Sequence, residues 1–521
     1  MVWNTVMRDA FNRAKERALQ RMKKNNDSNV FFEKDSFPGY NPKNEKPKFK
    51  LTDNFYANYE LKKINSDGVS EQPKPSRYAR NVREIRIGFD FGTSTVKIVV
   101  SESTGHIYAV PFFEKSGVDA YLLPCVLFES NGIFSLFGGD VRYSDLKKNL
   151  NSYTSEGEVL ITIAFLALVI RYVRAYIFDT TDLMNVKKLI WSLNLGMPSI
   201  HITEEGYKSD PKINYLRSIA ISSWLVASES STITCELVKE KFDFVREHQK
   251  KEGIQFFDQS IFPEINVIPE LSAQIYAFVR SDSFDPDAKN IFAMVDVGAS
   301  TLDTAMFHVV RRNAKWSFYF YSNNVQPLGV YNLHAKRIEW WTQKMKQKGY
   351  DDALNVLRNY KNLNYQNIPE KFTDYFDNVM INSDPEKDGP DFEFYRDVRQ
   401  QVTGMIYNPY KEKRLNKNQI RDTPVFYCGG GMRMQFYQRL KCDLKNVPGT
   451  SWLSTNEITL KLPEKFDVHD ISNCDFDRLS VAYGLSTISV DDIFKVEPLP
   501  NNEMQIVSGL YKERFISKDM I

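Results

Sequence analysis

The sequence predicts an α/β protein that is long enough to form two lobes. From residue 85 onward, short apolar runs typical of buried strands alternate with helical patterns, the order expected of an α/β fold. Three of the apolar runs, within residues 85–95, 292–303 and 425–433, break directly into tight turns of Gly, Ser and Thr. With 521 residues, the chain can build two lobes that each enclose a core.

The three turns together predict a nucleotide-binding site. Such turns expose backbone N–H groups and hydroxyls, which wrap a phosphate without a cationic side chain. An aspartate stands at the strand end of the first two segments, Asp90 and Asp296. Carboxylates beside a phosphate suit Mg²⁺, which keeps several of its waters and bridges to phosphate oxygens.

The elements of the first lobe, residues 81–288, follow the apolar runs. Strands are expected at residues 85–91, 95–101, 107–113, 122–128 and 189–198, and helices at 215–226 and 237–250. The apolar stretch 159–170 predicts a helix buried inside the protein, because it is too short to span a bilayer and runs into Arg171 and Arg174.

The second lobe, residues 289–521, repeats the strand–turn pattern. Strands are expected at residues 291–297, 304–310 and 316–321, followed by an outer subdomain over about 335–415 and a further strand from residue 423. Only a short tail follows residue 486.

Residues 1–80 predict a helix and an extended linker arm. Apolar residues recur at helical spacing at Trp3, Met7, Ala10, Phe11, Ala14, Ala18 and Met22, opposite a basic face. The helix either docks on the protein itself, on a partner or on another copy, or lies on an anionic membrane; the thin apolar face disfavours the membrane. Residues 25–80 are polar with interspersed aromatic anchors, which predicts an arm and not a separate domain.

Composition predicts a soluble cytoplasmic protein. Lys and Arg number 68 against 66 Asp and Glu, so the charge balance points neither to nucleic acid nor to a membrane surface. The five cysteines are scattered without a CxxC pair and are expected to be reduced core thiols. No GxxxxGK[ST] segment is present, which excludes a P-loop ATPase.

The chain resembles a known superfamily in these motifs, the ATPases that share the actin, sugar-kinase and Hsp70 fold. Asp90-Phe-Gly-Thr-Ser-Thr95 is similar to the first phosphate motif, and Asp296-Val-Gly-Ala-Ser-Thr-Leu-Asp303 to the second. Gly429-Gly-Gly-Met-Arg433 resembles the adenosine motif, residues 267–273 the connecting helix, and residues 479–486 the helix after the adenosine motif. The sequences of these motifs are most similar to those of the Hsp70 ATPase domain. This resemblance implies a two-lobed actin-like fold of duplicated ribonuclease H-like domains.

The resemblance implies ATP/ADP and Mg²⁺ as ligands and assigns the site residues. The catalytic acids would be Glu270, which orients the attacking water, Asp303 near that water, and Asp90 and Asp296, which hold the hydrated metal. Phosphate oxygens would lie against Gly92, Thr93, Ser94, Thr95, Gly298, Ala299, Ser300 and Thr301, and adenosine against Gly429, Gly430, Gly431 and Arg433.

Each assignment has a structural alternative. Asp90 and Asp296 could be solvated turn residues, and Glu270 a helix-start carboxylate favoured by the helix dipole. Arg433 could be a surface residue instead of a stacking partner for the base. For Lys97, on the strand after the first turn, a solvated strand lysine is favoured over phosphate contact.

The chain departs from the family in four places. Ala299 and Ser300 replace glycines of the second turn, and their Cβ atoms predict slow or partner-stimulated hydrolysis. No residue matches the catalytic lysine of Hsp70s, whose outer subdomain is shortened here. Residues 199–262 are longer and more polar than the Hsp70 counterpart and form either a partner surface or a peripheral insertion. No room remains after residue 486 for a peptide-binding domain of the Hsp70 type.

The function expected from this resemblance is a slow Mg²⁺-dependent ATPase that acts as a conformational switch for a protein partner, reached through the N-terminal arm or the insertion. An actin-like filament protein is the alternative. A small-molecule kinase ranks third, because Asp303 would be its only obvious general base.

Overall fold

The computed structural model describes residues 60–151, 155–197, 210–280, 284, 290–312, 315–360, 363, 367–376, 389–445 and 451–488. All of them belong to the second of the chain's two units, Lys48–Ile521. The predicted N-terminal helix, the aromatic anchors before residue 60 and the tail from residue 489 lie outside the described residues.

The first half of the chain builds a mixed sheet of seven strands. Its order is β15-β3-β2-β1-β8-β9, with β4 paired to β2. The strands are β1 Asn81–Phe91, β2 Thr95–Glu102, β3 Ile107–Ala109, β4 Leu123–Pro124, β8 Val186–Met197, β9 Glu264–Pro269 and, from far later in the chain, β15 Phe466–Asp467. β1 pairs antiparallel to β2 and parallel to β8, so it is a central strand, and its apolar residues from Ile85 to Phe91 are buried accordingly.

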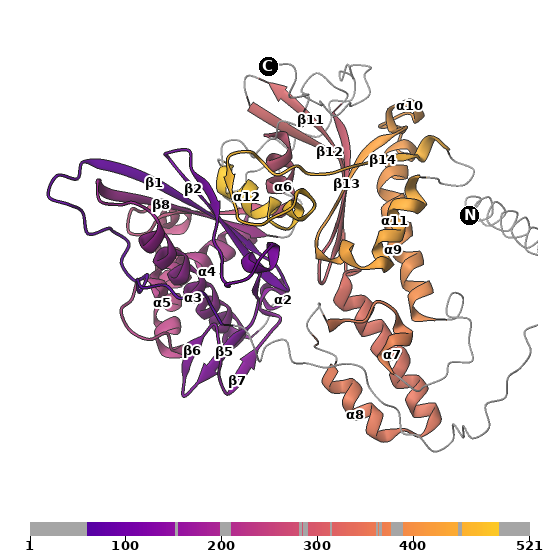
Figure 1. Cartoon of the computed structure of the whole chain (residues 1–521), viewed down its shortest axis with the longest axis horizontal. Coiled ribbons are helices and arrows are strands. Elements are labelled where there is room, and N and C mark those ends of the chain that lie inside the picture. The colour runs from indigo at the N-terminus through magenta and orange to yellow at the C-terminus, as the bar shows by residue number, and fades with distance from the viewer. Residues whose placement is uncertain are drawn as a thin grey trace, which may run out of the picture. The chain divides into compact units, whose positions relative to one another are not determined.

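Helices cover this sheet in the indigo-to-magenta part of Figure 1: α2 Leu146–Asn151, α3 Glu156–Thr180, α4 Pro211–Ala227 and α5 Cys235–Glu252. α3 begins at a capping box of Ser155 and Glu158. By length and composition α3 could cross a membrane, yet 72% of its most apolar window is buried in the protein, as predicted for a core helix. A small sheet of β5 Leu127–Ser130, β6 Ile133–Ser135 and β7 Val141–Tyr143 lies beside them.

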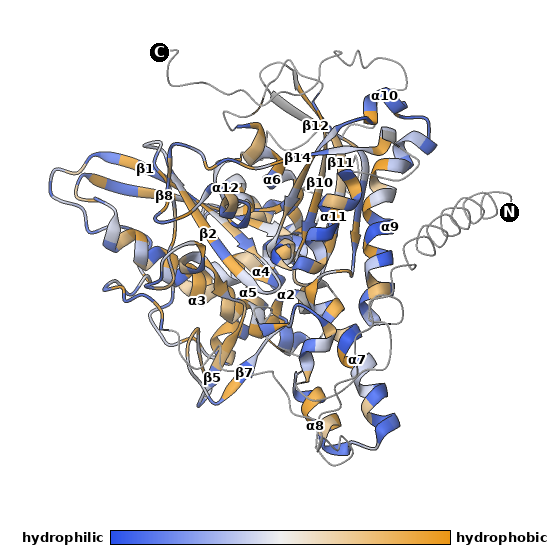
Figure 2. Cartoon of the chain, turned by 45° about the vertical axis from the view of Figure 1, so that its right-hand side comes forward, coloured by the Kyte–Doolittle hydropathy of each residue, from blue (hydrophilic) through white to orange (hydrophobic). Residues whose placement is uncertain are grey.

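The segment expected to be an insertion is partly core. α4 buries Ile213, Leu216, Ile219 and Trp224 in the same apolar cluster as β1 and β8. Figure 2 shows α3, which packs against α4, coloured mostly as hydrophobic. Only α5, which buries just three side chains, has the one-sided character of a peripheral helix. Of the two alternatives for residues 199–262, a partner surface or a peripheral insertion, the peripheral insertion does not describe α4.

The second half builds a five-stranded sheet in the order β12-β11-β10-β13-β14. The strands are β10 Ile291–Val297, β11 Leu302–Arg312, β12 Lys315–Gln326, β13 Thr423–Cys428 and β14 Thr455–Ile458. The helices are α7 Val330–Lys348, α8 Asp351–Asn359, α9 Pro390–Lys411, α10 Lys417–Ile420 and α11 Gln435–Lys445. Their apolar faces form a second core cluster, centred on Trp341, Val398 and Tyr437.

Two helices join the sheets through a third cluster. α6 Glu270–Val279 follows β9 directly, and α12 Ser480–Thr487, yellow in Figure 1, packs against α6, β1 and β2. Two glycines allow this contact: a Cβ on Gly88 would lie 2.2 Å from the Ala482 carbonyl oxygen, and one on Gly484 would lie 1.9 Å from that of Ala273. Backbone therefore packs directly on backbone at both places.

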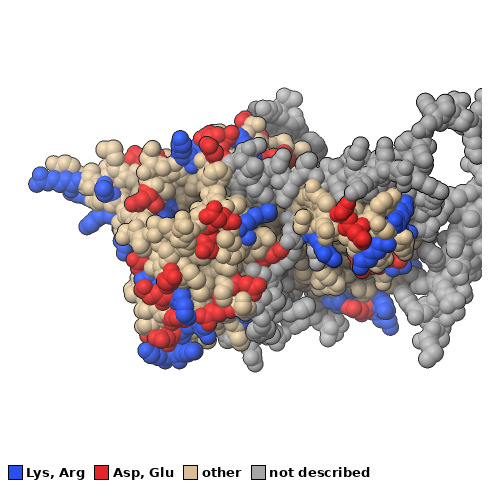
Figure 3. All heavy atoms as spheres, turned by 90° about the horizontal axis from the view of Figure 1, so that it is seen from below, with Lys and Arg blue, Asp and Glu red and all other residues tan. Residues whose placement is uncertain are grey.

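These observations confirm a mixed α/β fold and correct two predictions. Residues 267–269, expected within the connecting helix, are the end of strand β9. Cys125 and Cys428 are buried as expected, but Cys235, Cys442 and Cys474 are exposed. On the face seen in Figure 3, positive and negative side chains of the described residues are interspersed, in keeping with the balanced composition.

Candidate functional site

Two hairpins of the molecule have the same backbone design. In the first turn, residues 92–95 between β1 and β2, the Gly92 N–H donates to the Thr95 carbonyl over 3.2 Å. In the second turn, residues 298–301 between β10 and β11, the Gly298 N–H donates to the Thr301 carbonyl over 2.9 Å. Each turn directly follows a buried central strand, so each is held on a rigid support.

A third turn, residues 429–431, lies next to the second. β13 runs parallel to β10, and Cys428 is in register with Asp296. Gly429 has a φ of 87°, and a Cβ there would lie 2.2 Å from Asp296 Oδ1. Only glycine fits this position, because it tolerates both the left-handed backbone and the close approach of the carboxylate.

The three turns line one cleft. Of the predicted site residues, the cleft is lined by Asp90, Gly92, Thr93, Ser94, Thr95, Glu270, Asp296, Gly298, Ala299, Ser300, Thr301, Asp303, Gly429, Gly430 and Gly431. Residues that are more than three hundred positions apart in the sequence thus face the same space. Lys97, Lys147, Val330, Asp477, Arg478 and Val481 complete the lining.

Arg433 does not line the cleft. Its guanidinium instead pairs with Asp477, at 2.5 Å, and with Asp475, at 3.4 Å. The neighbouring Arg478 lies in the wall where the sequence placed Arg433, and a Cβ on Gly430 would meet its Nη1. The structure therefore favours the surface alternative for Arg433.

Lys97 belongs to the cleft, so its interpretation as a solvated strand lysine is wrong. It is the residue opposite Asp90 in the β1–β2 ladder, and its Nζ lies 2.9 Å from Asp90 Oδ2. Both side chains are largely buried, with exposures of 13% and 7%, which makes this a paired charge in the wall of the cleft.

Lys147 is one of the cleft residues that the sequence did not reveal, together with Asp477 and Arg478. It lies on the short helix α2 and reaches Glu270 Oε1 at the start of α6 over 2.5 Å. Burial lowers the pKa of Lys147, but the Glu270 carboxylate outweighs that effect, so the pKa is raised and the amine stays charged. Burial raises the pKa of Glu270, an effect that the Lys147 charge offsets only in part.

The second hairpin carries two carboxylates where the first carries an ion pair. Asp296 is opposite Asp303 in the β10–β11 ladder, as Asp90 is opposite Lys97. Burial, reinforced by the Asp303 charge, raises the pKa of Asp296 to about 7. Burial and the Glu270 charge raise the pKa of Asp303 to about 6. Both carboxylates therefore give up their protons less readily than an ordinary aspartate.

The residues of the second turn fit a hydrated cation and a phosphate. Ser300 Oγ and Asp303 Oδ1 are buried and have no hydrogen-bond partner among the described residues, so a ligand would supply what they lack. Within the same residues, no three His, Cys, Asp or Glu side chains are close enough to ligate a bare metal ion.

The second turn is supported from behind by α7. The Gly329, Val330 and Tyr331 N–H groups donate to the carbonyls of Ser300, Gly298 and Ala299 at 3.3, 3.2 and 2.7 Å. These N–H groups belong to the first turn of a helix whose N-terminus has no side-chain cap. The carbonyls of residues 298–300 are thus bonded to the start of α7, whereas the Gly298 N–H is bonded within the turn to Thr301.

No family model matches this chain, and no curated protein is similar to it.

Proposed function

We propose that the chain is a Mg²⁺-dependent ATP-binding protein with the two-lobed actin-like fold, and that it is a slow ATPase acting as a conformational switch for a protein partner. The two sheets, each with its own helices and core cluster, would be the two lobes. The resemblance of the motifs to Hsp70 and actin ATPases supports this reading of the fold.

One observation carries the proposal: two equivalent β-hairpin turns and a glycine-rich third turn line a single cleft together with five carboxylates, two lysines and Arg478. Backbone N–H groups in such turns bind phosphate oxygens. Phosphoryl transfer requires mainly positioning and neutralisation of charge, and this arrangement offers both.

The residues then have distinct tasks. Lys97 provides positive charge beside the phosphates, and its ion pair with Asp90 holds the amine in place. Asp296 and Asp303 attract the cation through its waters. Mg²⁺, when bound, would neutralise charge on the phosphate oxygens.

Glu270 is the residue best placed to orient the attacking water. It begins α6, which fixes its position, and its raised pKa makes it a better proton acceptor than an ordinary glutamate. Lys147 is a positioning residue in this scheme, because it holds the Glu270 carboxylate.

The test is calorimetric titration of the protein with Mg²⁺ and ATP, combined with phosphate release by wild type, Glu270→Ala and Lys147→Met. We expect all three to bind ATP and only the wild type to hydrolyse it at the full, slow rate. Binding without hydrolysis by the wild type would indicate a nucleotide-gated scaffold. No binding would refute the proposal, and sedimentation with and without ATP separates a switch from a filament.

A further inference from the structure

A segment before the first strand, residues 60–73, is bound along helix α3; we call it the strap. Its backbone enters with the Lys62 N–H donating to the Phe112 carbonyl over 2.7 Å. The Asn65 and Ser66 N–H groups then donate to the Asp179 carboxylate, at 2.5 and 3.0 Å. The strap is therefore fixed at the C-terminal end of α3 by several polar contacts.

The strap backbone touches α3 directly at Gly68. Its φ is 67°, and a Cβ there would lie 1.9 Å from the Arg171 carbonyl oxygen. A position that excludes every side chain indicates a shaped groove, since a loosely resting segment would tolerate alanine.

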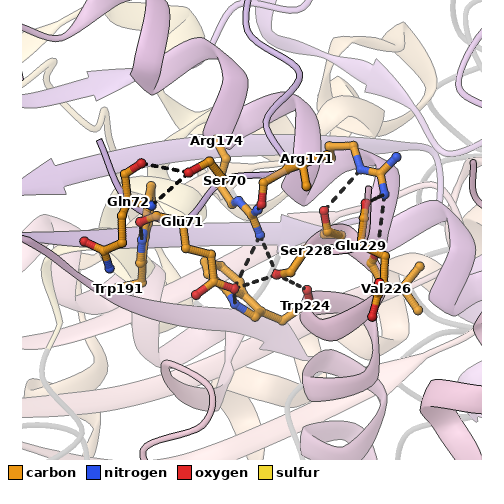
Figure 4. A network of polar contacts seen from close by, with 12 residues as sticks. Ser70, Glu71, Gln72, Arg171, Arg174, Trp191, Trp224, Val226, Ser228 and Glu229 are labelled. Carbon is orange, nitrogen blue, oxygen red and sulfur yellow. Dashed lines mark hydrogen bonds and ion pairs between the residues drawn. The ribbon is translucent and has the colours of Figure 1, made fainter. Parts of the chain in front are cut away.

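Glu71 is the centre of the strap, and Figure 4 shows its side chain among groups from three elements. The Trp224 Nε1–H and the Ser228 hydroxyl donate to Glu71 Oε1 over 2.6 and 2.5 Å. The Trp191 Nε1–H donates to the Glu71 carbonyl over 2.7 Å. These donors on α4 and β8, with the residue after α4, form a receptor for one carboxylate and one peptide carbonyl.

Gln72 occupies a free stretch of sheet edge. β9 pairs with β8 only from Ser192 onward. Before that point, the Gln72 side-chain oxygen accepts a hydrogen bond from the Leu189 N–H over 3.1 Å. The Gln72 side-chain nitrogen donates to the Leu189 carbonyl over 3.4 Å. One amide side chain thus imitates a neighbouring strand and covers polar edge groups.

The strap leaves part of the receptor unsatisfied. Arg174 is fully buried, yet its Nη1 is 3.8 Å from the nearest Glu71 oxygen, and its Nε has no hydrogen-bond partner among the described residues. Its Nη1 donates to Ser228 and its Nη2 to the Val69 carbonyl. Burial, only partly countered by Glu71, lowers the pKa of Arg174 to about 10. A carboxylate that engaged the guanidinium with two oxygens would fit the site better.

We propose that the groove between α3, α4 and the edge of β8 is a peptide-docking site, which the strap fills in cis and which a partner fills with an extended segment carrying glutamate followed by glutamine. The imperfect pairing of Glu71 with Arg174 makes the strap a displaceable occupant. The strap is then an autoinhibitory contact, and the partner's peptide is recognised by its carboxylate and its edge-covering amide.

The test uses the full-length protein and a fluorescein-labelled peptide of residues 61–76, with binding followed by fluorescence anisotropy. In the wild type, the strap competes with the labelled peptide for the groove. In Glu71→Gln, the isosteric change weakens the strap but leaves the groove intact, so we expect the peptide to bind this variant about tenfold more tightly than wild type. A peptide with the same Glu71→Gln change should lose about tenfold in affinity for the variant. Glu60→Gln, at an exposed position of the strap, is the matched control and should behave as wild type.

Gln72→Ala provides a second way to loosen the strap if the Glu71→Gln chain does not fold, because the Gln72 side chain is exposed and carries no charge. Equal binding of the peptide to wild type and to the weakened variants would place its site elsewhere and overturn the proposal. Absence of binding to folded variants would overturn it as well. Nucleotide titration of the same samples reports on the ATP site independently.

Discussion

The first and second turns share a backbone and differ in charge. Both hairpins close with the same N–H to carbonyl bond, and both place an aspartate at the end of a central strand. Across the ladder, however, Asp90 faces Lys97, whereas Asp296 faces Asp303. The first hairpin is neutral in itself and the second is not. In the proposed function, the phosphate would lie nearer the first turn and the accompanying cation nearer the second.

The largest effect is expected from making the second hairpin like the first. Asp303→Lys would place a cation opposite Asp296, so the divalent ion would lose its site and the water its neighbouring carboxylate. We expect phosphate release to fall about 1000-fold. Asp397→Lys, on an exposed face of α9, is the control for the charge change itself. A loss of less than about tenfold would mean that the second hairpin is not the cation side.

Removing the Lys97 charge from the first hairpin should lower the stability of the protein. Lys97→Met leaves the Asp90 carboxylate buried without its partner, which we expect to lower the free energy of unfolding by about 3 kcal/mol. Asp303→Asn, in the equivalent position of the second hairpin, relieves repulsion and should leave stability unchanged or higher. Urea denaturation of both variants measures the contrast. Equal destabilisation by the two variants would show that the charge difference between the hairpins does not affect the free energy of unfolding.

The pH dependence of stability should come from the second hairpin. Because the pKa of Asp296, about 7, is raised above its value in an unfolded chain, its contribution is complete at low pH and is lost as the pH rises through about 7. Without ligand, the free energy of unfolding should therefore fall between about pH 4 and about pH 7 and level off above that, by about 1 kcal/mol for this partly open side chain. Thermal unfolding of Asp296→Asn should show a flatter profile, and an unchanged profile would contradict the assignment.

The smallest effect concerns the residues that replace glycine in the second turn. Ala299 and Ser300 are not among the described residues with positive φ, so their Cβ atoms cause no backbone strain. Ala299→Gly should consequently lower stability by about 0.5 kcal/mol through the entropy of the unfolded chain. We expect phosphate release to change less than twofold. A large gain in hydrolysis would restore the idea that this turn sets the slow rate.

The sequence was most informative where a motif is contiguous. The strand at 291–297 and the turns after β1, β10 and β13 could be predicted because apolar runs end at glycines with a specific conformational task. The helix in 159–170 was also predictable from its unbroken hydrophobicity, although α3 extends to Glu156–Thr180.

Partnerships across the chain could not be predicted in this way. Lys147 is one of two adjacent lysines on a six-residue helix, and nothing local distinguishes the one that reaches Glu270, 123 positions later. The prediction for Lys97 was wrong for the same reason. The alternation of side chains along a strand cannot distinguish a solvent-exposed face from the wall of a cleft. The burial of α4 depended on its neighbour α3, whose hydrophobic surface extends all round and so requires cover on more than one side.

The position of α12 also bears on how the protein is made. One face of the first sheet is covered by a helix at residues 480–487, against strands that begin at residue 81. A ribosome adding about 5 to 20 residues per second needs roughly 20 to 80 s to travel between the two. During that time the backbone around Gly88 is without the helix that packs closely on it in the folded protein. The first sheet therefore lacks the cover of α12 until residues 480–487 have been made.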